Sequence, residues 1–124
     1  MKNSNNKTLN NESFKMLFDE GKHLFNKGDI HEAHIIWEKI WKYGDGNMRK
    51  NIKGFIQLSG SLVNKSYGKQ RAAEYLMEKA KSNILESEML SNKVSIRNIV
   101  KQIDKFIVSA NDCGCCCSIA TITL

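Results

Sequence analysis

The chain has 124 residues, of which 41% are hydrophobic and 26% charged, a composition that predicts one folded domain and excludes a wholly disordered chain. It has no proline and no apolar run long enough to cross a bilayer or to form a signal peptide, so we expect neither a membrane span nor a secretion signal. The net charge of +6 is spread along the chain and not gathered in a basic block with interleaved aromatics, which argues against nucleic-acid binding and favours a solvated basic surface.

The predicted elements, taken in chain order, are all helices. Residues 1–11 are polar and Asn-rich, and we expect them to be flexible. After them apolar residues recur at steps of three and four, the spacing of one helix face, and no segment shows the period-two alternation of a strand. The expected helices cover residues 12–27, 30–42, 48–66, 69–86 and 93–109.

Short connections separate these helices, and several of them contain glycine, which permits the positive φ that a tight turn needs. They are Gly28-Asp29, residues 43–47, Tyr67-Gly68 and residues 87–92. Helices joined by short connections pack antiparallel. The sequence therefore predicts an all-α protein, a small antiparallel bundle of four to five helices over residues 12–110, followed by a disordered Cys-rich tail at residues 111–124.

The stretch from Phe25 to Trp41 contains a Gly-Asp turn, a Glu-Ala-His step and a downstream Glu and Trp. A Lys-Gly-Phe-Ile-Gln-Leu block follows at residues 53–58, and a Gly turn then leads into a helix rich in Ala and Leu. Over residues 14–85 this pattern resembles the small all-helical family known as "domain of unknown function 309". The resemblance implies a helical fold and no particular activity. Its motif positions are Glu32, His34, Glu38, Trp41 and Gln57.

One position departs from that family's pattern. The fourth residue of the family's Glu-Ala-His-Glu step is Ile35 in this chain, so any chemical task of that carboxylate would be missing here.

On a helix His31, His34 and Glu38 are spaced three and four apart and share a face. Two imidazoles and a carboxylate in this arrangement could hold a metal ion, form an acid–base pair, or recognise a partner or peptide in a non-enzymatic interaction domain. We favour a structural role, in which His34 borders the apolar stripe and bonds to a buried Glu38. We likewise expect Gln57 to be a buried hydrogen-bonding residue. No catalytic residue is predicted, because no nucleophile triad, phosphate loop or dinucleotide fingerprint is present.

Two tryptophans lie in the second predicted helix, Trp37 and Trp41, and both are expected to anchor the core. In the third helix a run of small residues would let a neighbouring helix approach closely. These residues are Gly54, Ser59, Gly60 and Ser61.

All four cysteines lie beyond the last helix, and residues 1–112 contain none. They are Cys113, Cys115, Cys116 and Cys117. Bridges among them would close almost no loop, so an ordinary disulfide scaffold is excluded. A body that holds together without cross-links fits the reducing cytoplasm, where we expect the chain to be made.

Four interpretations of this tail compete. Its thiols suit a copper(I) cluster, whereas zinc is disfavoured because three consecutive cysteines cannot easily point at one ion. A redox role lacks a Cys-x-x-Cys motif at a helix N-terminus. An inert tail is possible, and prenylation is excluded because the last four residues contain no cysteine. The fourth interpretation is that the tail is the substrate of a modifying enzyme.

The substrate interpretation rests on the residue types. Cys, Ser and Thr each place a nucleophile on the β-carbon beside a backbone amide, so an enzyme that activates the preceding carbonyl can close a thiazoline or oxazoline ring. A dehydratase could instead remove water from Ser and Thr for thioether bridging. The candidate modified residues are Cys113, Cys115, Cys116, Cys117, Ser118, Thr121 and Thr123.

The segment Cys116-Cys117-Ser118-Ile119-Ala120-Thr121 resembles the core of the streptolysin S class of linear azole-containing peptides. This resemblance implies a bacterial, bacteriocin- or toxin-like peptide precursor whose helical domain is the leader. Its implied partners are a cyclodehydratase, dehydratase or radical enzyme for maturation and a leader protease or exporter, with export of the mature peptide. The chain departs from that class by having no double-glycine site before Cys113 and a leader of about 110 residues. The interpretation also predicts that removing residues 113–124 leaves the bundle's stability almost unchanged.

Overall fold

The computed structural model describes residues 8–112 and 122–124, and these contain helices but no strand. The elements are α1 (Asn11–Lys27), α2 (Ile30–Tyr43), α3 (Gly46–Ser66), α4 (Gln70–Ile84), the short 3₁₀ helix η2 (Glu88–Leu90) and α5 (Ile96–Asp112). The predicted all-α class and the five main helices are confirmed. No helix among the described residues is long and apolar enough to cross a membrane.

The helix ends follow local chemistry. The Asn10 side chain accepts a hydrogen bond from the backbone N–H of Ser13 at 2.7 Å and caps the start of α1. Asp45 caps α3 in the same way through the N–H of Met48 at 2.9 Å. Gly28 ends α1 with a φ of 97°, a left-handed conformation that glycine adopts without strain.

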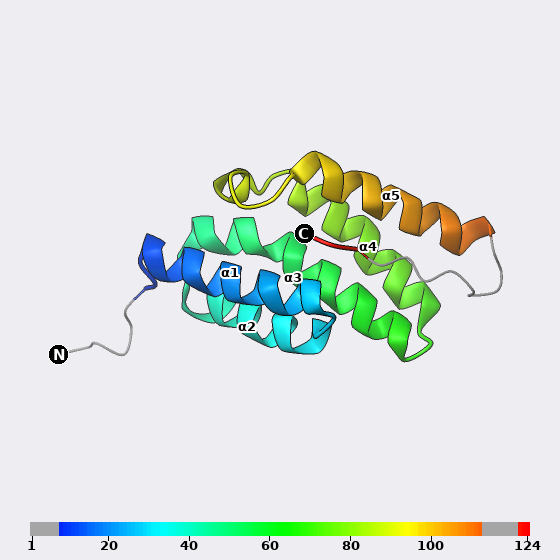
Figure 1. Ribbon diagram of the computed structural model, residues 1–124, viewed down its shortest axis with the longest axis horizontal. Coiled ribbons are helices and arrows are strands. Elements are labelled where there is room, and N and C mark those ends of the chain that lie inside the picture. The colour runs from blue at the N-terminus through cyan, green and yellow to red at the C-terminus, as the bar shows by residue number, and fades with distance from the viewer. Residues whose placement is uncertain (1–7, 113–121) are drawn as a thin grey trace.

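Each helix packs on the next one along the chain, from α1 against α2 through to α4 against α5 (Figure 1). The turn containing η2 is fixed to α3 by the buried Asn51, whose side-chain oxygen accepts from the N–H of Met89 at 2.9 Å. This order of packing puts α1 and α5 at the two ends of the series. The last residues of the sequence lie between them (Figure 1).

An aromatic cluster forms the centre of the core. The indole of Trp37 is fully buried and stacks on Phe18, with ring centroids 5.8 Å apart, and its Nε1 donates to the Phe18 carbonyl. Phe55 meets both rings edge-on. The indole lies directly over Gly21, where no side chain would fit. Burial of these large aromatic side chains stabilises the fold.

The last three residues differ from the predicted disordered tail. Ile122 is 5% exposed and belongs to the hydrophobic core, and Leu124 packs against that core. Residues 113–121 lie outside the described residues. The expectation that removing residues 113–124 leaves the stability of the bundle almost unchanged stays a prediction, and the burial of Ile122 argues against it for residues 122–124.

The other end of the chain also departs from expectation. The backbone N–H of Leu9 donates to the carbonyl of Tyr43 at 3.0 Å, and the Leu9 side chain packs against the core. The flexible segment predicted for residues 1–11 thus extends too far, because Leu9 and Asn10 are held by the end of α2 and by the cap of α1.

Candidate functional site

A groove of about 320 Å³ runs between α2, α3 and α4. Its lining is mainly apolar, with a few polar side chains from α2 and α3, which is the usual composition of a small ligand or side-chain site. The lining residues are His31, His34, Ile56, Gln57, Gly60, Val63, Asn64 and Leu76. Two of the family-motif residues, His34 and Gln57, therefore share one groove.

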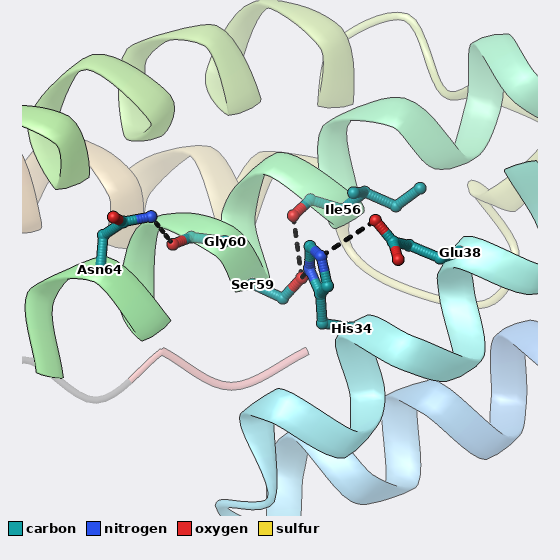
Figure 2. Close-up of polar contacts among 6 residues, drawn as sticks. All are labelled: His34, Glu38, Ile56, Ser59, Gly60 and Asn64. Atoms are coloured by element: carbon teal, nitrogen blue, oxygen red, sulfur yellow. Dashed lines mark hydrogen bonds and ion pairs between the residues drawn. The ribbon is translucent and has the colours of Figure 1, made fainter. Parts of the chain in front are cut away.

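His34 projects from α2 toward α3, and both of its ring nitrogens have partners (Figure 2). Its Nδ1 lies 2.7 Å from the hydroxyl of Ser59, and its Nε2 lies 3.2 Å from a carboxylate oxygen of Glu38. Contacts at both nitrogens fix the plane of the ring. The imidazole edge is thereby held beside the groove in one orientation.

The trio of Glu38, His34 and Ser59 does not form a nucleophilic triad. Ser59 is fully buried, and its hydroxyl donates to the carbonyl of Ile56 at 2.8 Å within α3. An activated serine must be exposed to its substrate and give its proton to the histidine. Here the serine is buried against the His34 ring and the Ile56 carbonyl, so the arrangement positions a histidine and presents no hydroxyl to a substrate.

The predicted bond between His34 and Glu38 is confirmed, but the predicted burial of Glu38 is wrong, because its side chain is 57% exposed. The carboxylate sits on the outer edge of α2, where water solvates it. An ion pair at such a site contributes little to stability. Its effect is to orient the imidazole.

Gln57 makes the hydrogen bond expected of it. Its side-chain oxygen accepts from Asn83 of α4 at 2.7 Å, and it is half-buried where full burial was expected. At the far end of the groove Asn64 donates to the carbonyl of Gly60 at 2.8 Å (Figure 2). Both amides therefore line the groove with their hydrogen bonds satisfied.

The remaining motif residues stay outside the groove. Glu32 is exposed on α2 and does not line it. Trp41 was expected to anchor the core, but its side chain is 44% exposed. It packs beneath Arg49, whose guanidinium carbon lies 5.8 Å from the ring centroid and whose Nε donates to the Trp41 carbonyl. The second tryptophan is thus held by a cation–π contact at the surface.

The metal site predicted from His31, His34 and Glu38 lacks a complete ligand set in the part of the chain that the structure describes. His31 is exposed and is not bonded to His34 or Glu38. Within residues 8–112 and 122–124 no group of three or more His, Cys, Asp or Glu side chains lies close enough to hold a metal ion. The tail thiols fall outside the described residues.

Of the candidate modified residues, only Thr123 lies within the described part of the chain. Its side chain is exposed, while its backbone N–H donates to Gln102 of α5 at 2.9 Å. The other six candidates lie outside the described residues. They are Cys113, Cys115, Cys116, Cys117, Ser118 and Thr121.

Residues 18–76 match a family model. Its description is "Domain of unknown function (DUF309)". The matched region runs from within α1 into α4 and contains every residue that lines the groove. No curated protein and no solved structure matches the chain. The match supports the helical resemblance, and the Cys-rich tail lies outside it.

Sequence reasoning identified Ser59 as a small packing residue and missed it as the partner of His34. A signal was present, because a serine in an otherwise apolar helix stripe needs a hydrogen-bond partner. It also missed Asn26 and Gln102, which hold the last two residues. No local pattern marks those two, since their partners are 98 and 21 positions away.

Proposed function

We propose that this protein is the precursor of a ribosomally synthesised, post-translationally modified peptide. The helical bundle serves as the leader, and the segment from Cys113 to Thr121 serves as the modified core. The observation that carries this proposal is the distribution of cysteine, with all four in residues 113–117 and none in the bundle. The bundle closes its core with aromatic and aliphatic side chains and uses no thiol.

The chemistry needs only the tail residues and an external enzyme. The thiol of a cysteine adds to the carbonyl carbon of the preceding residue, forming a C–S bond. The carbonyl oxygen leaves as water, with one proton from the thiol and one from the amide nitrogen. Conversion of the ring to an azole then removes two electrons and two protons, which a two-electron acceptor of the enzyme takes up. The chain is a substrate in both steps and not an enzyme.

The hydrogen bonds that hold residues 122–124 bear on which candidate residues we propose as modified. A ring closed at Thr123 would remove its backbone N–H, which donates to Gln102. We therefore expect no ring at Thr123 while residues 122–124 are docked. The proposed set becomes Cys113, Cys115, Cys116, Cys117, Ser118 and Thr121.

The leader would act by tethering. A maturation enzyme that docks on the bundle has the short tail at high local concentration, so several residues can be modified during one encounter. A cyclodehydratase, dehydratase or radical enzyme would fill this role, and a protease or exporter would then act on the leader. The precursor would reside in the cytoplasm and its product would be exported.

A second candidate is a non-enzymatic interaction module, and the groove beside His34 favours it. An apolar groove with an oriented imidazole can receive a partner's side chain without any chemistry. A third candidate is copper binding through the tail thiols. Neither requires a covalent change in the tail.

Counting free thiols separates these candidates. The chain is purified from its native host, unfolded with a reductant and a chelator, and alkylated; the same chain made alone in a foreign host is the control. We expect four alkylated cysteines in the control and fewer in the native sample, because a thiazole carries no thiol. Four in both samples would contradict azole formation and leave copper binding or the interaction module.

A further inference from the structure

The seam between α1 and α5 holds the backbone of the last two residues through two side-chain amides. Gln102 accepts from the N–H of Thr123 at 2.9 Å and donates to its carbonyl at 2.8 Å. Asn26 accepts from the N–H of Leu124 at 2.8 Å and donates to its oxygen at 3.2 Å. Each amide thus bonds both polar groups of one residue, as a neighbouring β-strand would.

The side chains of the docked segment alternate in direction. Ile122 enters the core and Leu124 packs against it, whereas Thr123 between them is exposed. This alternation is that of an extended strand with one buried face. Main-chain hydrogen bonds and pockets for alternate side chains are the features of a peptide-binding edge, here supplied by two helices.

We propose that the α1/α5 seam is a peptide-docking site for a short extended segment of the pattern apolar–any–apolar. The chain fills this site with its own Ile122–Leu124. The backbone bonds to Asn26 and Gln102 supply sequence-independent affinity, and the burial of Ile122 supplies selectivity. This inference stands whether or not the tail is modified.

The chain's own Ile122–Leu124 occupies the seam because this segment is covalently joined to α5. Nine residues, 113–121, connect the end of α5 to Ile122, and a tether of this length gives an effective concentration far above that of a free peptide. Leu124 also forms one wall of a neighbouring cleft of about 620 Å³ that Lys22, Lys93 and Asn98 line, so the seam is open to solvent on that side. A peptide supplied in trans can therefore enter once the cis segment is displaced.

The test uses the full chain carrying Ile122→Asp, which places a charge where the core accepts only an apolar group. A fluorescent peptide with the sequence of residues 119–124 is titrated into this variant and into the unaltered chain, and anisotropy is recorded. The variant binds the peptide, whereas the unaltered chain binds it at least tenfold more weakly because its seam is filled. Far-UV circular dichroism verifies that both chains keep their helices.

Matched peptides and variants distinguish recognition of the peptide backbone from nonspecific hydrophobic binding. A peptide with Thr123→Ala binds as well as the parent, because that side chain is exposed. A peptide methylated on the Thr123 nitrogen loses the bond to Gln102 and binds roughly tenfold more weakly. Adding Gln102→Ala to the Ile122→Asp chain has a similar effect, and adding Lys101→Ala, an exposed neighbour, has none.

Two results would overturn the proposal. One is a helical Ile122→Asp chain that fails to bind the peptide; the other is equal binding of the methylated peptide. If Ile122→Asp prevents folding, amide hydrogen exchange is measured instead on the full chain with Gln102→Ala. Faster exchange at Thr123 supports the docking site, and unchanged exchange there contradicts it.

Discussion

At the scale of single residues, the two tryptophans of α2 show how a shared sequence character leads to different environments. Trp37 falls at the centre of the apolar stripe and is fully buried against Phe18 and Phe55. Trp41 lies one position past Ile40 on the same helix and faces the surface beside Arg49. Helical spacing places both near the stripe, but only tertiary packing decides which one is covered.

Because the two tryptophan rings differ in burial, replacing each by alanine is expected to lower the free energy of unfolding by different amounts. Trp37→Ala lowers the free energy of unfolding by ~3–5 kcal/mol, the range for loss of a buried aromatic side chain. Trp41→Ala, the matched variant, lowers it by about 1 kcal/mol or less, because a half-exposed ring loses little burial and one surface cation–π contact. Urea unfolding of both variants measures the two values. Equal losses would contradict the assigned burial.

The two partners of His34 are also expected to differ in how much they contribute to the free energy of unfolding. Ser59→Ala removes the fully buried partner of Nδ1 and lowers the free energy of unfolding by ~1–3 kcal/mol. Glu38→Gln alters an exposed ion pair and changes it by less than about 0.5 kcal/mol. Thermal melts followed by circular dichroism compare the two. A larger loss from Glu38→Gln would mean that the carboxylate, and not the hydroxyl, fixes the ring.

At the scale of the elements, the glycines of α3 separate close packing from an open groove. A Cβ on Gly54 would lie 2.6 Å from a side-chain carbon of Ile84 and 2.7 Å from its backbone nitrogen, so α4 would have to move. A Cβ on Gly60 would lie 3.7 Å from both His34 and Leu76, an ordinary contact inside the groove. The sequence correctly predicted small residues on this helix but not which of them touch a neighbour.

Alanine at these two positions is therefore expected to act in opposite directions. Gly54→Ala lowers the free energy of unfolding by ~1–3 kcal/mol through overpacking. Gly60→Ala raises it by about 0.5–1 kcal/mol, because alanine favours the helix and meets no clash. Denaturant unfolding of the two variants measures both changes in the free energy of unfolding. Destabilisation by Gly60→Ala would show that the groove is tighter than its geometry indicates.

Helix positions were predictable because the apolar spacing is a local property of the sequence. The predicted ends were less accurate, as at α5, which begins at Ile96 and not at Lys93. The reason is that the backbone N–H groups of Lys93 and Val94 donate to Leu90 and form a turn. The groove was predictable only in part: its histidine and glutamine stood out in a motif, whereas its serine resembled a packing residue.

At the scale of the whole molecule, the last three residues complete the bundle. The helices pack in chain order (Figure 1). Ile122 and Leu124 pack on the core, and the segment is bonded to Asn26 of α1 and Gln102 of α5. A contact such as Asn26 with Leu124 spans 98 positions and leaves no periodic trace in the sequence. This is why a sequence-based interpretation treated the entire tail as separate from the fold.

Deletion of residues 122–124 tests this placement. We expect the free energy of unfolding to fall by ~2–4 kcal/mol, since a buried isoleucine and four backbone hydrogen bonds are lost. Thr123→Ala in the full chain is the control and should change it very little, because that side chain is exposed. If the deletion leaves the melting temperature unchanged, docking of residues 122–124 is contradicted. The expectation that the tail does not contribute to stability would then hold.

The central claim is that the segment between Cys113 and Thr121 is enzymatically modified, and the mass of one peptide tests it most directly. No Lys or Arg follows Lys105, so trypsin releases Phe106–Leu124 as one piece containing every candidate residue. The peptide Gly54–Lys65, which contains Ser59 and Ser61 inside α3, is the internal control.

In the chain from its native host, we predict that Phe106–Leu124 is lighter than its sequence mass by one water per ring closed, and by two further hydrogens per azole. Tandem spectra should place the losses within residues 113–121, with Thr123 and the control peptide unmodified. An unchanged mass for Phe106–Leu124 would contradict the account.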